Sequence, residues 1–475
     1  MQTQPKPVVI VGNCLAGMVA AAELGMQGTP VVLVNGSRNW GGHFTSRNIR
    51  GANFDLGTVC FEFTSFAKDQ LLDVSLYGTR ARYDIARFCQ ASRDYVEGLL
   101  PIHESSTPLM VWKGEIVPDL IMANDLSILR RVSEGAAAQI ERETRAILAC
   151  ANRPLHASTK LDNPLYVSSS YEDASLANHG AMFHRMFVEP FADKLLPGGA
   201  RSFAAIYHRC LWMPLYYPET VLAALGPQPH ALRPTLFHYP AKGYVGALPE
   251  AILERMGASG RVTIVAAEVT EVRREGIFRI SLSTGEKLEA ERLVWGLDLA
   301  SLARVSGISD IDSKDASEKK TSAAFCFLIV DRKKIRATLS SLFVVDRERI
   351  AYRIANQSEA AAIDEPQARL VVECNAQFFG EGKPDLELLT KQVCQDLIEL
   401  GIVEAESAIL HAESLYAPQI LPIPNENDRE RCLALLARVR DRLPTIESVG
   451  PASGYFTKSL NDQLIQGLQV AKRCS

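Results

Sequence analysis

Three small residues near the N-terminus have the spacing of a phosphate-binding turn. Gly12-x-Cys14-x-x-Gly17 matches the dinucleotide pattern at its first and third glycines, and Cys14 stands where the central glycine is usual. Glycines in such a turn let the backbone approach a pyrophosphate, which the amides at the start of the next helix then hold. We therefore expect Gly12, Cys14, Leu15, Ala16 and Gly17 to contact a dinucleotide.

The elements that must position this turn flank it on both sides. Residues 8–11 and 31–34 are continuous runs of valine, isoleucine and leucine, which are typical of strands buried in a parallel sheet. Between them, residues 18–27 are rich in alanine and leucine and stop at Gly28, a common way for a helix to end. The pattern predicts a βαβ unit.

Asn35 follows the second strand, at the position where an acidic residue usually binds the adenosine ribose. Its amide can hydrogen-bond to ribose hydroxyls, but without the added strength that a charged carboxylate brings. Arg38 could instead meet a 2′-phosphate, so these residues alone leave NADP open as the dinucleotide.

A second glycine pair, Gly41-Gly42, is followed by His43 and Phe44, and then by the run NFDLG at residues 53–57. This combination resembles the amine-oxidase-like superfamily of FAD proteins, which includes monoamine oxidases, protoporphyrinogen oxidases, carotenoid desaturases and UDP-galactopyranose mutases. In that superfamily the second glycine loop lets the backbone approach the ribityl phosphate of the flavin. The resemblance implies that Gly41, Gly42, His43 and Phe44 contact FAD.

Later segments resemble the same superfamily in the same order. Residues 237–252 look like its Pro-x-x-Gly segment, residues 262–272 like the strand whose backbone meets the adenine near Val269, and residues 285–299 like the following strand. Residues 450–471 resemble the closing flavin-binding loop and helix. A helix start at the flavin N1–C2=O edge would stabilise the anionic reduced flavin through the helix dipole. The residues that the resemblance places there are Gly454, Asn461, Asp462 and Gln463.

The resemblance implies an α/β fold with a Rossmann-type FAD-binding domain of the GR2-like kind and an α+β substrate domain built from helical and β-rich insertions. It also implies non-covalent FAD, because no His or Cys near the double glycine is placed for a covalent link. The FAD-binding domain is expected to comprise three segments, at 1–64, 236–305 and 445–475, the last of which closes the domain. The substrate domain is expected to comprise a helical segment at 65–235 and a β-rich segment at 306–444.

Three residues are candidates for catalysis. Glu62 stands among the apolar residues 60–63, where burial would raise its carboxyl pKa and suit it to act as an acid or base. Lys242, just before Gly243, could face a flavin or simply solvent. Tyr416 stands in the β-rich segment that would form the floor of a substrate pocket.

The resemblance favours a FAD-dependent oxidoreductase (an oxidase, dehydrogenase or desaturase) that transfers a hydride from a small organic substrate to flavin N5. A non-redox isomerase resembling the mutases is an alternative, although Val59 and Glu62 occupy positions that carry histidines in true mutases. A catalytically silent flavin-fold protein, acting as a binding or partner subunit, is a second alternative that Cys14 and Asn35 keep open.

Composition excludes several other classes of protein. A net charge of −4 over 475 residues offers no basic field for nucleic acid. The ten cysteines form no CxxC pair, which argues against a zinc site or a disulfide framework and favours free thiols in a reducing cytoplasm. No apolar run is long enough to span a membrane. The electron acceptor and any partner protein are left open.

Overall fold

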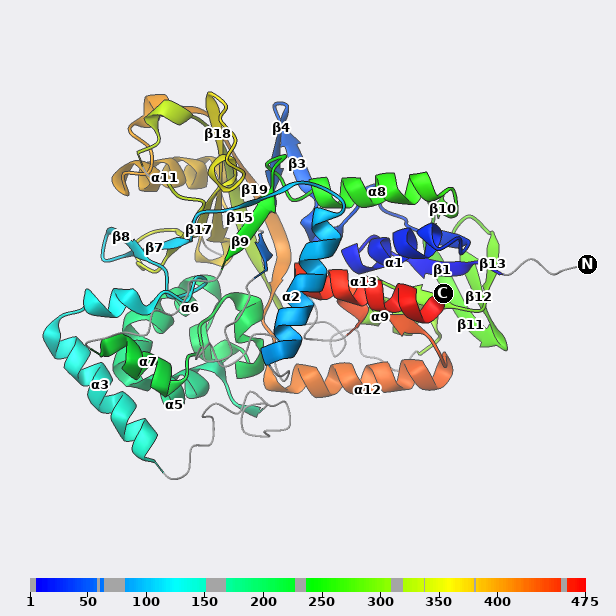
Figure 1. Ribbon diagram of the computed structural model, residues 1–475, viewed down its shortest axis with the longest axis horizontal. Coiled ribbons are helices and arrows are strands. Elements are labelled where there is room, and N and C mark those ends of the chain that lie inside the picture. The colour runs from blue at the N-terminus through cyan, green and yellow to red at the C-terminus, as the bar shows by residue number, and fades with distance from the viewer. Residues whose placement is uncertain are drawn as a thin grey trace, which may run out of the picture.

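The computed structural model describes residues 6–57, 60–63, 82–150, 168–226, 236–308, 319–336, 338–379, 382–453 and 459–475. It has two lobes that lie side by side along the long axis of the molecule (Figure 1). Both ends of the chain belong to one lobe, which we call the Rossmann lobe. The other, the distal lobe, is built from the middle of the chain.

The Rossmann lobe is centred on a five-stranded sheet. The pairings of β1 with β2 and β14, of β10 with β2 and of β14 with β20 are all parallel. Its strand order is β10 (Val262–Val265), β2 (Val31–Val34), β1 (Val8–Val11), β14 (Leu293–Trp295) and β20 (Glu447–Ser448). The predicted α/β fold class is confirmed, and all five strands fall within the three segments expected to bind the cofactor.

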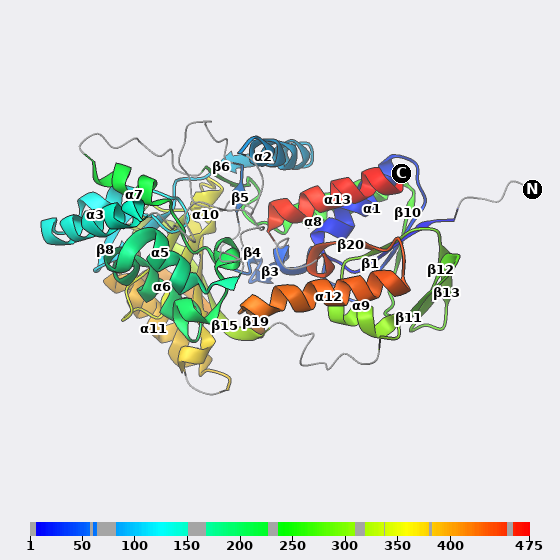
Figure 2. The same ribbon diagram turned by 90° about the horizontal axis from the view of Figure 1, so that it is seen from below.

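Alternate residues of β1 face opposite sides of this sheet, as the pleat requires. Val8 and Ile10 pack against the helices α1 (Leu15–Met26), α8 (Ala247–Ser259) and α13 (Leu460–Cys474). Val9 and Val11 face the other side. That side is covered by α9 (Leu299–Val305), α12 (Glu426–Arg442) and the small sheet of β11 (Val269–Glu275), β12 (Ile277–Leu282) and β13 (Lys287–Ala290), as Figure 2 shows for the two helices.

Helices α1 and α13 lie side by side on the sheet and approach each other closely (Figure 1). A Cβ at Gly467 would lie 2.5 Å from the Val19 Cβ and 2.6 Å from the Ala16 carbonyl oxygen. The absence of a side chain at Gly467 therefore sets the distance between the two helices. Because α13 is the last helix of the chain, this contact also fixes where its first turn lies.

The distal lobe contains a seven-stranded sheet. One face packs against α11 (Leu386–Glu399), and the other places Phe327 against Phe54 of the hairpin β3 (Ser46–Ile49) and β4 (Ala52–Asp55). The strand order is β19 (Ile409–Pro422), β15 (Lys320–Asp331), β18 (Gln367–Asn375), β17 (Ala351–Asn356), β16 (Ser341–Val344), β7 (Leu109–Trp112) and β8 (Glu115–Pro118).

The segment expected to be helical, 65–235, is only partly so. Strands β7 and β8 belong to it, and β7 pairs in parallel with β16, more than two hundred residues later in the chain. A third strand of this segment, β6 (Ile102–Glu104), joins β5 (Phe61–Glu62) and β9 (Phe237–Pro240) in a small sheet. The described helices of this segment are α2 (Arg82–Glu97), α3 (Glu134–Ala149), α5 (Tyr171–Phe183), α6 (Glu189–Leu195) and α7 (Pro218–Leu225). A short helix, α10 (Gln357–Ala360), follows β17 in the β-rich segment.

None of the described helices is both long and apolar enough to cross a bilayer. Within the described ranges, no group of three or more His, Cys, Asp or Glu side chains is arranged to hold a metal ion.

Replacing Gly467 with alanine should destabilise the protein, because the new methyl group would meet backbone and a β-branched side chain at less than van der Waals distance. We expect the free energy of unfolding to fall by about 2 kcal/mol, measured by urea unfolding. Gly257→Ala in α8 is the matched control, since a Cβ there meets nothing within 4 Å. A gain of up to about 1 kcal/mol is expected for the control. Equal stability of the two variants would contradict the close-packing argument.

Candidate functional site

The two glycine loops lie together at the carboxyl edge of the parallel sheet. The Gly12 amide donates to the Val34 carbonyl oxygen (2.8 Å), which ties the first turn to the neighbouring strand. The Gly41 amide donates to the Asn13 carbonyl oxygen (2.9 Å), and Cys14 and Gly41 form an isolated β-bridge. Ligands of open α/β sheets bind at this edge, outside the carboxyl ends of the strands.

Positive φ angles explain why glycine stands at these turns. Gly12, Gly41 and Gly42 have φ values of 105°, 86° and 63°, which side chains rarely allow. Among the described residues, a Cβ at Gly42 would meet only the Cys14 Cα, at 3.9 Å, so little of the described chain crowds this backbone. After the pair, Phe44 is buried in the core, whereas His43 is exposed and lies against the Phe44 ring.

Cys14 is the N-cap residue of α1, and Leu15 and Ala16 form the first turn of the helix. The Gly17 amide donates to the Cys14 Sγ (3.4 Å). Burial raises the pKa of this thiol to about 11, so it is protonated at neutral pH. The predicted phosphate-binding turn is therefore formed, and the cysteine in it already satisfies one of its amides.

Asn35, predicted to bind the ribose, makes hydrogen bonds within its own loop. It is buried, its Nδ2 donates to the Ser37 carbonyl oxygen (2.8 Å), and its Oδ1 accepts from the Ser37 amide (3.0 Å). The side chain thus closes its own loop, and its predicted contact with the adenosine stays a prediction. Arg38 is exposed on the same loop.

Val269 begins β11, directly after the segment that borders the loop following β2. A Cβ at Gly36 would lie 2.8 Å from the Glu268 Cγ, so the two segments touch just before Val269. This is the end of the site at which the resemblance expects the adenine.

The first turn of α13 contains two buried oxygen atoms to which no described residue donates a hydrogen bond. Ser459 caps the helix, and Asp462 completes a capping box. Asn461 Oδ1 and Gln463 Oε1 are buried, and neither has a hydrogen-bond partner among the described residues. Buried carbonyl oxygens are costly without a donor. The two glycine loops around Gly12 and Gly41-Gly42, which we call the glycine cradle, and these oxygens together fit a dinucleotide that presents phosphates at one end and N–H groups at the other. Gly454, and also Val59, lie outside the described residues.

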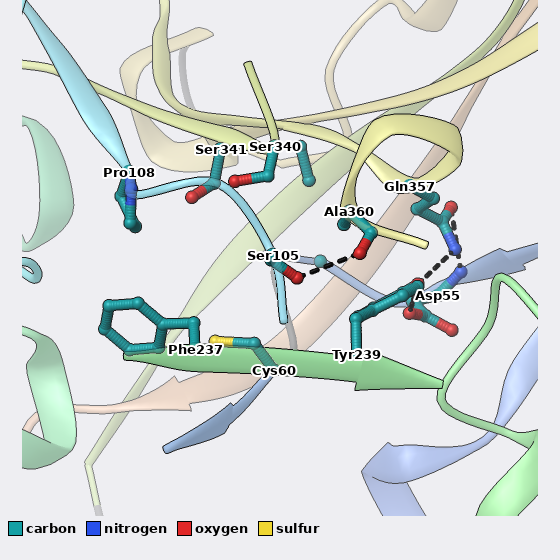
Figure 3. A pocket seen from close by; sticks show the side chains of 12 residues that line it. Asp55, Cys60, Ser105, Pro108, Phe237, Tyr239, Ser340, Ser341, Gln357 and Ala360 are labelled. Carbon is teal, nitrogen blue, oxygen red and sulfur yellow. Dashed lines mark hydrogen bonds between the residues drawn. The ribbon is translucent and has the colours of Figure 1, made fainter. Parts of the chain in front are cut away.

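A small pocket lies where the lobes meet, and Figure 3 shows the side chains that line it. Gly57 and Tyr239 line it beside the Rossmann lobe, and Ser341 and Ala355 line it from β16 and β17 of the distal sheet. Phe237 and Cys60 face Ser340 and Ser341 across it (Figure 3). The lining residues carry hydroxyl, carboxyl and amide groups, but most of the surface that they expose to the pocket is apolar carbon.

The pocket is bordered by Asp55, the aspartate of the FDLG motif. Its carboxylate is 1% exposed and accepts hydrogen bonds from the Ser46 hydroxyl (2.8 Å), the Val245 amide (2.8 Å) and the Tyr239 hydroxyl. Gln357 donates to the Tyr239 oxygen (2.8 Å) and accepts from the Asp55 amide (3.3 Å). Burial raises the pKa of the Asp55 carboxyl to about 6, against the opposing effect of these hydrogen bonds. Sequence reasoning used the motif as a landmark and overlooked its acid.

A second overlooked group is Arg353, on β17. Its guanidinium pairs with Glu373, which is 2% exposed and also accepts from the Tyr352 hydroxyl (3.0 Å). Arg353 Nε and Nη1 are buried without a hydrogen-bond partner among the residues described. A Cβ at Gly57 would lie 2.9 Å from the Glu373 Cδ, so this ion pair stands directly behind the pocket wall. Donors left over on a buried guanidinium suit an anionic group.

The three predicted catalytic residues are scattered. Glu62 is half-buried, and its carbonyl oxygen accepts from Asn461 Nδ2 (2.6 Å), so it lies beside the first turn of α13. Lys242 is exposed in the turn after β9. Tyr416 packs on the α11 face of the distal sheet, with its hydroxyl 3.1 Å from the Ser322 Oγ. Only Glu62 is brought to the site, because the strand register turns Tyr416 to the face opposite the pocket.

The raised pKa of Asp55 predicts a pH dependence of stability. The carboxyl has its ordinary pKa of 3.8 in the unfolded chain and a pKa of about 6 in the folded protein. Protonated Asp55 therefore contributes stability below about pH 4, and this contribution is lost as the pH rises through 6. Compared with Asp55→Asn, the wild type should therefore lose about 3 kcal/mol of unfolding free energy between about pH 4 and pH 7, measured by urea unfolding. Tyr239→Phe removes a hydrogen bond that lowers this pKa, so it should move the transition to higher pH. Parallel pH profiles for all three proteins would contradict the assignment.

No protein-family model and no curated protein matches this chain. Solved structures do match it. A reduced UDP-galactopyranose mutase has a TM-score of 0.72 at 16% identity, over 99% of this chain and 94% of the mutase. A protein from Exiguobacterium sp. 255-15, provisionally named a protoporphyrinogen oxidase, has a TM-score of 0.67 at 15% identity, over 99% of this chain and 98% of its own.

Putrescine oxidase bound to putrescine matches with a TM-score of 0.61 at 12% identity, over 99% of both chains. All three of these proteins are similar to the present chain over nearly its whole length, so the two lobes are shared and not only the Rossmann unit. At such low identity the likeness speaks for architecture alone. The expected resemblance is confirmed at that level: this chain has the fold of the amine-oxidase-like superfamily of FAD proteins.

Proposed function

We propose that this chain binds FAD non-covalently and is a flavoenzyme that oxidises a small organic molecule held between the lobes. The observation that carries the proposal is the meeting of three elements at one edge of the parallel sheet. The Gly12 turn, the Gly41-Gly42 loop and the first turn of α13 come together there, although they are distant in sequence. The likeness to a mutase and to two oxidases supports a flavin as the ligand of this edge.

The residues that would hold FAD form two groups, one for its phosphates and one for its flavin ring. The amides at the start of α1 and the backbone of Gly41 and Gly42 suit the pyrophosphate and the ribityl phosphate. The buried oxygens of Asn461 and Gln463 suit N–H groups of the flavin ring. FAD, when bound, supplies a ring that accepts a hydride equivalent.

The residues around the pocket supply orientation and a proton site. The lobes enclose the substrate and keep water away from it. Tyr239 and Gln357 hold the Asp55 carboxyl in one position, and this carboxyl can take up or release a proton near neutral pH. Glu62, next to α13, is a second candidate acid or base at the other end of the site.

The purified protein should be yellow and should release FAD on acid or heat denaturation. We would record the absorption spectrum, identify the released flavin by chromatography, and then screen polar amines, alcohols and amino acids for anaerobic bleaching. Bleaching by one of them would support the oxidoreductase assignment. A colourless protein that also fails to take up added FAD would overturn the proposal and favour the silent flavin-fold alternative.

One observation favours a second candidate function, a non-redox isomerase acting on a sugar nucleotide. Arg353 has two buried nitrogen atoms without a partner among the described residues, and it pairs with Glu373, whose carboxyl lies behind Gly57 of the pocket wall. Such a group could bind the diphosphate of a nucleotide sugar, which is the kind of molecule named in the mutase that this chain resembles.

The isomerase candidate predicts that the full chain binds uridine diphosphate and that Arg353→Lys weakens this binding at least tenfold, about 1.4 kcal/mol. Lysine keeps the charge opposite Glu373 but loses the planar fork of donors. Isothermal titration measures the affinity, and Arg347→Lys, in an exposed ion pair with Asp193, is the matched control. Absence of uridine diphosphate binding by the wild type would eliminate this candidate.

A further inference from the structure

The Cys14 thiol occupies a niche made by three glycines. Its Sγ lies 2.6 Å from the position that a Cβ of Gly296 would take, 2.9 Å from that of Gly450, and 3.6 Å from that of Gly17. The cysteine is 4% exposed. Side chains at Gly296 or Gly450 would collide with the sulfur, so the space around the phosphate turn is shaped to hold this thiol.

The thiol also acts on the helix amides. The first amides of a helix have no acceptor within the helix, and they bind either a capping side chain or a ligand. The Gly17 amide donates to the Cys14 Sγ (3.4 Å). A pyrophosphate at this turn would use the same group of amides, so the cap and the ligand compete for them.

A separate observation marks the niche as the border of a ligand site. Gln463 Oε1 lies 3.5 Å from the position of a Gly450 Cβ, on the α13 side of the niche. Gln463 is 3% exposed, and no described residue donates to its Oε1. Among the described residues, this buried oxygen beside the capped amides has no donor, and a ligand at the turn could supply one.

We propose that Cys14 is an internal cap of the phosphate-binding helix, which stabilises the protein without its dinucleotide and lowers its affinity for FAD. This inference rests on the proposed function, because it concerns the same site. A glycine at this position, as in the usual pattern, would leave the amides available to the pyrophosphate. The helix would then be less stable when no dinucleotide is bound.

The test compares the full chain, stripped of bound flavin, with its Cys14→Ala, Cys14→Gly and Cys14→Ser variants. Affinity for FAD is measured by quenching of flavin fluorescence, and the melting temperature is measured without FAD. Alanine and glycine should each bind FAD at least tenfold tighter and melt several degrees lower. Serine, whose hydroxyl can accept from the Gly17 amide, should stay within about threefold of the wild-type affinity.

Cys326→Ala is the matched control, because Cys326 is fully buried in the distal sheet, away from the cradle. It should lower the melting temperature and leave FAD affinity unchanged. If the wild type binds FAD and the alanine variant binds it equally well, the inference is overturned while the proposed function stands. If only the glycine variant binds more tightly, the Cβ and not the cap is responsible, which also overturns it.

If neither the wild type nor any variant binds FAD, the proposed function fails, and the claim that Cys14 lowers FAD affinity fails with it. The claim that Cys14 caps the helix is then decided by the melting temperatures alone. An alanine variant that melts below the serine variant supports it, and equal melting temperatures overturn it.

Discussion

The buried carboxylate of Asp55 lies where the two lobes meet. It lies at the end of β4 and accepts hydrogen bonds from Ser46 on β3, from Val245 before α8 and from Tyr239 on β9, while its own amide donates to Gln357 of the distal lobe. A carboxylate removed from water is tolerated only where such donors surround it. The pocket borders this group, so the constraint that joins the lobes also shapes the proposed substrate site.

The carboxyl edge of the parallel sheet shows how departures from a binding pattern can be accommodated locally. Asn35 turns its amide into its own loop, and Cys14 places its sulfur among glycines. The sulfur accepts from the Gly17 amide, and the Asn35 side chain bonds to the backbone of Ser37. At the same edge, the oxygens of Asn461 and Gln463 remain without donors among the described residues.

Local patterns predicted the elements whose signals are local. The apolar runs at 8–11 and 31–34 became β1 and β2, and the alanine-rich stretch between them became α1. The segment 65–235 was only partly predicted, because β7 is a strand by virtue of its pairing with β16, far away in the chain. Arg353 carried no recognisable motif, and only the sheet register places it beside Glu373 and behind the pocket.

By itself, the sequence determined the βαβ unit, the two glycine loops and the likeness to FAD proteins, since spacing and periodicity are properties of neighbouring residues. Tertiary structure alone decided which polar groups are satisfied. It turned Tyr416 to the α11 face, left Lys242 exposed, and buried Asp55 where its pKa rises. These outcomes depend on burial and on contacts between segments hundreds of residues apart, and no local pattern encodes them.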